Sequence, residues 1–153
     1  MKTLEDQVAR MEKTADDFAA AIKGLSEAVL SKRPDDKNWA AKEIICHLRD
    51  TEELFMKRFQ TIIATDEPRF IPAEADRWAA ERQYRLNDAL DALSSFRRRR
   101  EEVLEFLRGL KPEQLERGGI HPTRGRMSIK DLVALIAGHD QNHLEQLQRT
   151  LAV

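Results

Sequence analysis

The sequence of 153 residues has one cysteine, six glycines, five prolines and no long apolar run. With Cys46 alone, an intramolecular disulfide is excluded and a reducing compartment is indicated, so we expect Cys46 to pack as a small apolar residue. No apolar segment approaches the roughly 20 residues that a membrane-spanning helix needs. The chain opens with MKTLEDQVARMEK, which lacks the apolar centre of a signal peptide. We therefore expect a cytoplasmic protein without a membrane partner.

An excess of either charge is also absent, because 26 basic and 27 acidic side chains leave a formal net charge of −1. Nothing global therefore attracts the chain to nucleic acid. Charged residues make up 35% of the chain and alternate with apolar ones, which is typical of solvated helix faces. We find no glycine-rich phosphate loop and no Ser-His-Asp arrangement. The length suits one domain with its own core, and we treat residues 1–153 as that domain.

What the sequence does contain is apolar residues at alternating steps of three and four, the pattern of amphipathic helices. We see no strand pattern, and we predict four helices over residues 4–31, 41–64, 76–110 and 128–151. In the third of these helices, Leu86 and Leu90 are expected on the core side. Four helices of this length predict an all-α four-helix bundle.

The connections bear on the topology of this bundle. Residues 65–75 contain two prolines and, at about 3.3 Å per residue, can span more than 30 Å, roughly the length of the preceding helix. Such a crossover permits the third helix to run parallel to the second. Ser128 and Asp131 form a plausible capping box for the last helix, whereas Ala40 cannot cap the second, so we assign that cap to Asn38.

The clearest chemical signal is a pair of histidines, His139 and His143, four residues apart on the apolar face of the last helix. A buried imidazole carries one donor and one acceptor that both need partners, and a metal ion with an outer acceptor supplies them. The alternative is two half-buried histidines bonded to neighbouring helices. If the second and fourth helices are antiparallel, His47 lies at a similar depth. Three imidazoles with an open fourth position are typical of catalytic metal sites.

Charged residues near these histidines have candidate roles of their own. Asp50 and Glu43 lie along the His47 side of the second helix, so we consider them for orienting His47 or for acting as a base. We expect Asp140 to form a salt bridge. Among the four consecutive arginines 97–100, we expect Arg100 to face inward in an ion pair between helices, with a substrate anion clamp as the alternative.

A third connection, residues 111–127, is long and rich in glycine and proline. It contains His121 directly before a proline. A loop histidine is more often exposed than bound to a metal ion, and in the expected topology this loop starts at the far end of the bundle. We therefore do not count His121 among the metal ligands.

Two segments resemble motifs of the DinB-like superfamily. Residues 39–52, WAAKEIICHLRDTE, are similar to its W-[ST]-x-x-E-x-x-x-H-L-x-D motif, and Ala40 departs from the usual Ser or Thr. Residues 120–147 are similar to its H-P-x-x-G loop and the H-x-x-x-H helix that follows. The resemblance extends over nearly the whole chain. It implies an up-down-down-up bundle in which His47, His139 and His143 bind a divalent metal ion, most often nickel or zinc.

The same resemblance bears on function. The superfamily includes YfiT-like proteins described as metal-dependent hydrolases, and S-transferases or isomerases that use a low-molecular-weight thiol. It implies a metal-dependent enzyme that acts on a small-molecule electrophile, for which Asp50 is our candidate catalytic residue. Two alternatives stay open. One is a non-catalytic metal-binding, stress-response module that forms a homodimer, and the other is a plain bundle with packed histidines.

Overall fold

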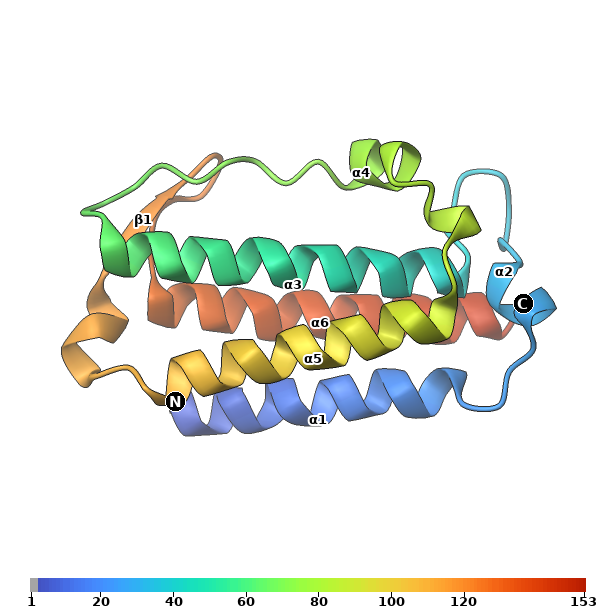
Figure 1. The fold of residues 1–153 in the computed structure, drawn as a ribbon, viewed down its shortest axis with the longest axis horizontal. Coiled ribbons are helices and arrows are strands. Elements are labelled where there is room, and N and C mark those ends of the chain that lie inside the picture. Colours follow the sequence, from blue (N-terminus) through green and yellow to red (C-terminus); the bar gives the residue numbers. More distant parts are fainter. Residues whose placement is uncertain (1–2) are drawn as a thin grey trace.

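The computed structural model describes residues 3–153, which form four long helices joined by shorter elements (Figure 1). The long helices are α1 (Leu4–Ile22), α3 (Ala41–Ala64), α5 (Ala89–Arg108) and α6 (Ile129–Leu151). Shorter helical elements are α2 (Glu27–Ser31), α4 (Ala75–Glu81) and the 3₁₀ turns η1 (Tyr84–Leu86) and η2 (Pro112–Glu116). A small antiparallel hairpin consists of β1 (Gly118–His121) and β2 (Gly125–Ser128).

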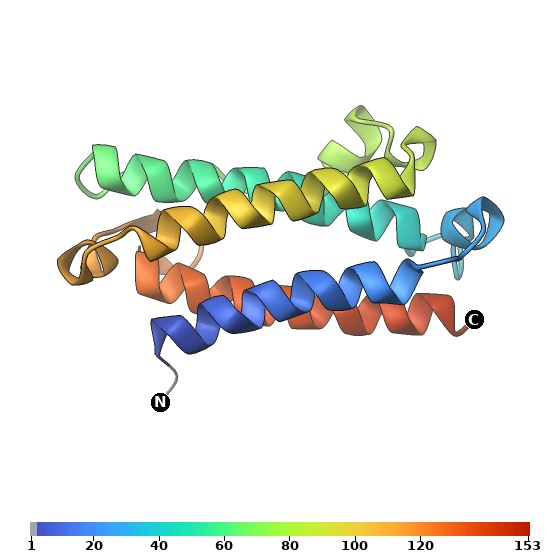
Figure 2. The same cartoon turned by 60° about the horizontal axis from the view of Figure 1, so that its bottom comes forward.

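The direction of the helices confirms the predicted all-α four-helix bundle with up-down-down-up topology. Helices α1 and α6 run one way and α3 and α5 run the other (Figure 1). Figure 2 shows α1 beside α6 and α3 beside α5. The crossover at residues 65–74 returns along the length of the bundle before α4, which is what lets α5 run parallel to α3 (Figure 1).

The core consists of two apolar clusters separated by a charged layer. One cluster includes Phe18, Ile44 and Phe96, and the other includes Met11 and Phe59. Between them along the helices lie the buried charged side chains of Arg100, Glu52 and Asp140. Within residues 3–153, no helix is both long and apolar enough to cross a lipid bilayer.

The first predicted helix is interrupted, because α1 ends at Ile22 and α2 begins only at Glu27. Gly24 has a φ of 75°, a left-handed conformation that glycine adopts without steric cost. The Ser26 side chain then accepts a hydrogen bond from the backbone N–H of Val29 (3.2 Å) and starts a new helix.

The third predicted helix begins thirteen residues later than expected, at Ala89 and not at residue 76. The side chain of Asp88 caps α5 by accepting hydrogen bonds from the backbone N–H groups of Leu90 (2.8 Å) and Asp91 (3.3 Å). Residues 75–86 form α4 and η1 instead. Leu86 and Leu90, expected in the core, are 78% and 59% exposed.

The cap of α3 also differs from the prediction. Ala40 is the N-cap residue, and the Glu43 carboxylate accepts a hydrogen bond from its backbone N–H (3.1 Å). Asn38 instead donates to the carboxylate of Asp35. The capping box of α6 is confirmed, because Ser128 and Asp131 bond reciprocally.

The final connection contains the hairpin that the sequence pattern did not indicate. Gly119 lies in β1 at a point where a Cβ atom would be 2.4 Å from the Phe70 ring, so only glycine fits there. Phe70 donates its backbone N–H to the carbonyl of Ile120 (2.9 Å), and Ile120 donates to the carbonyl of Pro68 (2.8 Å). The crossover and the hairpin are thereby joined along one side of the bundle.

Candidate metal centre

Three imidazoles from α3 and α6 meet inside the bundle. The Nε2 atom of His47 lies 3.3 Å from Nε2 of His139 and 3.1 Å from Nε2 of His143. His47 comes from the second turn of α3, and the other two project from adjacent turns of α6. The candidate ligand atoms of the three residues all lie within 4.8 Å of one another. This convergence confirms the three-histidine cluster expected from the sequence.

The spacing of these nitrogens fits a shared cation. Two nitrogen ligands at about 2.1 Å from one ion are about 3.0–3.4 Å apart in octahedral or tetrahedral geometry. A single N–H···N hydrogen bond pairs only two rings, whereas Nε2 of His47 has both other rings within 3.3 Å. A cation that accepts three lone pairs accounts for all of these contacts.

The Nδ1 atoms of the three histidines differ in their hydrogen-bond partners. The Nδ1 atom of His143 lies 2.8 Å from Oε1 of Gln146, which can only accept, so the proton sits on Nδ1 and Nε2 presents its lone pair inward. His139 Nδ1 is 3.6 Å from a carboxylate oxygen of Asp140, beyond hydrogen-bond length but within electrostatic reach. Within residues 3–153, Nδ1 of His47 is buried without a hydrogen-bond partner.

Aromatic rings limit the movement of two of the ligands. The Trp39 ring lies 5.1 Å from the His47 ring, and the Phe55 ring meets His139 edge-on at 5.7 Å. His47 is buried, while His139 and His143 are only partly buried. The cluster is therefore packed on one side and accessible on the other.

The electrostatics favour the neutral form of two of these imidazoles, His47 and His143. Burial, together with the neighbouring His143 and His139, lowers the pKa of His47 to about 3. Burial and His139 also lower the pKa of His143. Neutral rings have free lone pairs, which is the form that binds a metal ion.

The metal-free protein should lose stability as the pH falls below about 6.5. His47 has a pKa of about 6.5 in an unfolded chain and about 3 in the folded one, so the unfolded chain takes up the proton first. The contribution of neutral His47 to the free energy of unfolding is complete above pH 6.5 and is lost between pH 6.5 and 3. In this range the free energy of unfolding changes through His47 by at most about 1.4 kcal/mol per pH unit. Urea unfolding in chelator at several pH values measures this slope. A His47→Gln variant should show a shallower one, and an unchanged slope would contradict the assignment.

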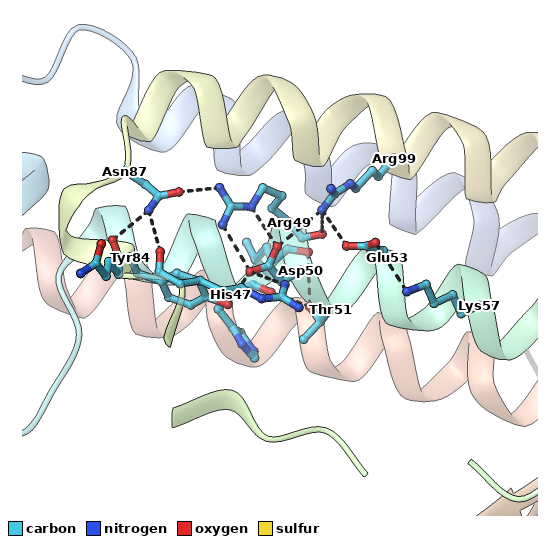
Figure 3. Close-up of polar contacts among 12 residues, drawn as sticks. His47, Arg49, Asp50, Thr51, Glu53, Lys57, Tyr84, Asn87 and Arg99 are labelled. Atoms are coloured by element: carbon cyan, nitrogen blue, oxygen red, sulfur yellow. Dashed lines mark hydrogen bonds and ion pairs between the residues drawn. The ribbon is translucent and has the colours of Figure 1, made fainter. Parts of the chain in front are cut away.

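Asp50 does not make the contact with His47 that we expected. Its carboxylate accepts hydrogen bonds from the hydroxyl of Tyr84 (2.6 Å) and from Arg49 (2.9 Å), and it pairs with Arg82 at 3.0 Å (Figure 3). Burial raises the pKa of Asp50, but the hydrogen bonds from Arg49 and Tyr84 outweigh it and hold the pKa below its usual value. These contacts tie α3 to η1. A catalytic role for Asp50 stays a prediction that this geometry does not support.

The remaining charged candidates have structural partners. Glu43 pairs with Arg33 through two hydrogen bonds of 2.8 and 2.7 Å, so it does not orient His47. Asp140 forms the expected salt bridge, at 2.8 Å, with Arg100. Arg100 is 2% exposed and faces inward, as its ion-pair interpretation requires, so it is not an anion clamp.

Cys46 is fully buried in α3, as expected for a small apolar residue. Burial raises the pKa of its thiol to about 11. The thiol therefore stays protonated and offers neither a nucleophile nor a metal ligand at neutral pH.

The three histidines line a cavity of about 530 Å³. Its other walls come from the crossover near Pro72 and from the tip of the hairpin, where His121 lines the same cavity without belonging to the metal cluster. Arg58 of α3 also lines this cavity, although it was not predicted from the sequence to be a site residue. It follows His47 by eleven residues, close to three helical turns, and that spacing was the available signal.

Comparisons with known proteins agree with this site and fold. A protein of Oceanobacillus iheyensis named "putative metal-dependent hydrolase" is 21% identical over 99% of this chain and 87% of its own length. A protein of the same name from Halalkalibacterium halodurans is 28% identical, over 83% of this chain and 74% of its own.

One solved structure shares the fold closely. YfiT from Bacillus subtilis, described as "a probable metal-dependent hydrolase with an unusual four-helix bundle topology", matches with a TM-score of 0.89 at 18% identity. The match covers 98% of this chain and 88% of YfiT.

A family model described as the DinB superfamily matches residues 10–147. That range reaches into all four long helices and includes the three histidines of the metal cluster. The chain therefore belongs to the DinB superfamily.

Proposed function

We propose that this protein is a metal-dependent enzyme in which His47, His139 and His143 hold a zinc or nickel ion. The proposal rests on one observation, the convergence of three Nε2 atoms beside a cavity that reaches solvent. The names of the relatives as metal-dependent hydrolases support it. The reaction we propose is attack on a small electrophilic molecule by water or by a low-molecular-weight thiol.

The side chains of the site have distinct roles in the proposed reaction. The three histidines would hold the ion, and the rings of Trp39 and Phe55 keep two of these histidines in place. A divalent ion held there would lower the pKa of a coordinated water or thiol and so supply a nucleophile near neutral pH. The part of the cavity wall that the structure describes contains no carboxylate, so it offers no Asp or Glu as a general base.

The chemical type of the ligand atoms also indicates which metal ion the site would favour. Three neutral imidazoles without a thiolate or carboxylate suit zinc and nickel better than the oxygen-seeking magnesium or calcium. Three protein ligands leave positions for water and substrate, as catalytic zinc sites do.

Metal content and turnover test this proposal together. Protein purified without a tag should contain close to one equivalent of zinc or nickel. The loaded protein should convert at least one member of a panel of esters, amides and thiol-plus-electrophile pairs faster than His139→Ala does. Metal far below one equivalent would overturn the metal site. Stoichiometric metal with no turnover above the His139→Ala control would overturn catalysis and favour the non-catalytic module.

A further inference from the structure

Arg58 is a buried cation that has no ion-pair partner within residues 3–153, although it is only 6% exposed. The other buried charged side chains of that range all have one: Lys42 pairs with Glu27, Glu43 with Arg33, Asp50 with Arg49, and both Glu52 and Asp140 with Arg100. Burial without a nearby anion lowers the pKa of Arg58. Because an unpaired buried charge is costly, this exception indicates an anion that arrives with a ligand.

The guanidinium of Arg58 is held in place yet keeps donor capacity. Its Nη2 atom donates to the carbonyl of Ile71 (2.9 Å), and its Cζ atom lies 5.2 Å from the centre of the Phe70 ring. Nε is buried without a partner, and Nη1 makes no hydrogen bond to any residue from 3 to 153. The crossover that supplies Ile71 and Phe70 therefore positions the cation without neutralising it.

The surroundings of Arg58 in the cavity add positive charge and donors. Arg124 supplies a second guanidinium to the cavity wall. His121 accepts hydrogen bonds at Nδ1 from the backbone N–H groups of Thr123 and Arg124, both at 3.2 Å, so its own proton lies on Nε2. This end of the cavity presents cations and donors, which is the chemistry that recognises an anion.

The cavity joins this cationic end to the three histidines. Arg58 and His47 are three turns apart on α3, about 16 Å along the helix axis. Between them the wall is mostly apolar, formed by Leu54 and Phe55 of α3 and by Leu135 of α6. Thr51 also lines it, but its hydroxyl donates to the carbonyl of His47 in its own helix (2.9 Å). A ligand that spans the cavity meets an anion site, then an apolar stretch, then the metal centre.

We propose that the Arg58 end of the cavity binds a carboxylate of the substrate. The substrate class is then an elongated, apolar small molecule with a carboxylate at one end and its electrophilic group at the other, near the histidines. Identification of the electrophilic end rests on the proposed function, whereas the carboxylate site does not require a bound ion. A carboxylate carries one charge, which matches the one charge of Arg58, whose Nε and Nη1 atoms make no hydrogen bond within residues 3–153.

Titration of the full ¹⁵N-labelled chain with hexanoate tests this site, both with zinc and without it. Hexanoate should cause saturable chemical-shift changes in the amide signals of the cavity-wall residues, both in the zinc-loaded and in the zinc-free protein. Hexanol, hexylamine and inorganic phosphate should bind more weakly. Arg58→Met should weaken hexanoate binding at least tenfold, and Arg58→Lys should retain most of it. Arg98→Met, which removes an exposed arginine of α5, is the matched control and should bind as the native chain does.

Several outcomes would overturn the carboxylate site. They are equal hexanoate binding by Arg58→Met, binding of hexanol or phosphate as tight as that of hexanoate, and hexanoate binding seen only with zinc. Zinc content is measured in the same samples, so failure of the metal site is recognised separately from failure of the anion site.

Discussion

Replacing His47 by alanine should weaken zinc binding by at least about 100-fold. Loss of a partner outside the ligand set already costs about 10–100-fold in metal affinity, and removal of a ligand costs more. His47 also supplies the Nε2 atom that lies within 3.3 Å of both other rings. Without His47, two histidines remain, both on α6, and two such ligands hold an ion far less selectively than three. Competition with a chromophoric chelator measures the affinity.

Two matched variants make the result specific to the three-histidine cluster. Gln146→Leu removes the acceptor at Nδ1 of His143 and should weaken zinc binding by about 10–100-fold. His121→Ala removes a histidine from the same cavity but outside the cluster, so it should bind zinc as the native chain does. If His121→Ala lost zinc as completely as His47→Ala, the ligand set assigned above would be wrong.

Replacing Arg100 by methionine should lower the free energy of unfolding by about 3–5 kcal/mol, the usual cost of removing one partner from a buried ion pair. Arg100 donates to both carboxylate oxygens of Glu52, at 2.7 and 2.8 Å, and to Asp140 at 2.8 Å. It also donates to the carbonyl of Met11 (2.9 Å). Methionine fills similar space but leaves two buried carboxylates facing each other without a cation.

Urea unfolding of three variants separates this effect from a loss of packing. Arg100→Met combined with Glu52→Gln and Asp140→Asn removes the two negative charges and should recover part of the lost stability. Arg98→Met, on the exposed side of the same helix, should change stability by no more than about 0.5 kcal/mol. A loss in Arg100→Met that is no larger than in Arg98→Met would refute a structural role for the charged layer.

Periodicity predicted the four helices because each buries one apolar stripe, and it placed the bounds of α3 and α6 to within one residue, but it misplaced the end of α1 and the start of α5. Gly24 interrupts the first helix through its backbone conformation, which leaves no trace in the spacing of apolar residues. In the third, Leu86 and Leu90 fit the helical repeat and yet are exposed. The Asp88 cap was the local signal for the true start, and it was outweighed by the longer pattern.

The metal cluster was predictable for a related reason. Residues four apart on one helix share a face whatever the tertiary structure, and His47 needed only an antiparallel neighbour to meet them. The rest of the cavity was not predictable in this way. Arg58 acquires its importance from having no anionic partner among residues 3–153, and His121 is brought to the cavity by a hairpin that pairs with the crossover. Both facts depend on contacts between distant segments.

The hydrogen bonds that join the crossover to the hairpin have an evolutionary consequence. The helices carry the three histidines, whereas much of the opposite wall comes from two connections that hold each other through Phe70, Ile120 and Pro68. Because connections tolerate sequence change better than packed helices do, this wall is free to diversify as a unit. On the proposed function, new substrate preferences can therefore arise within one lineage while the three-histidine site is inherited unchanged.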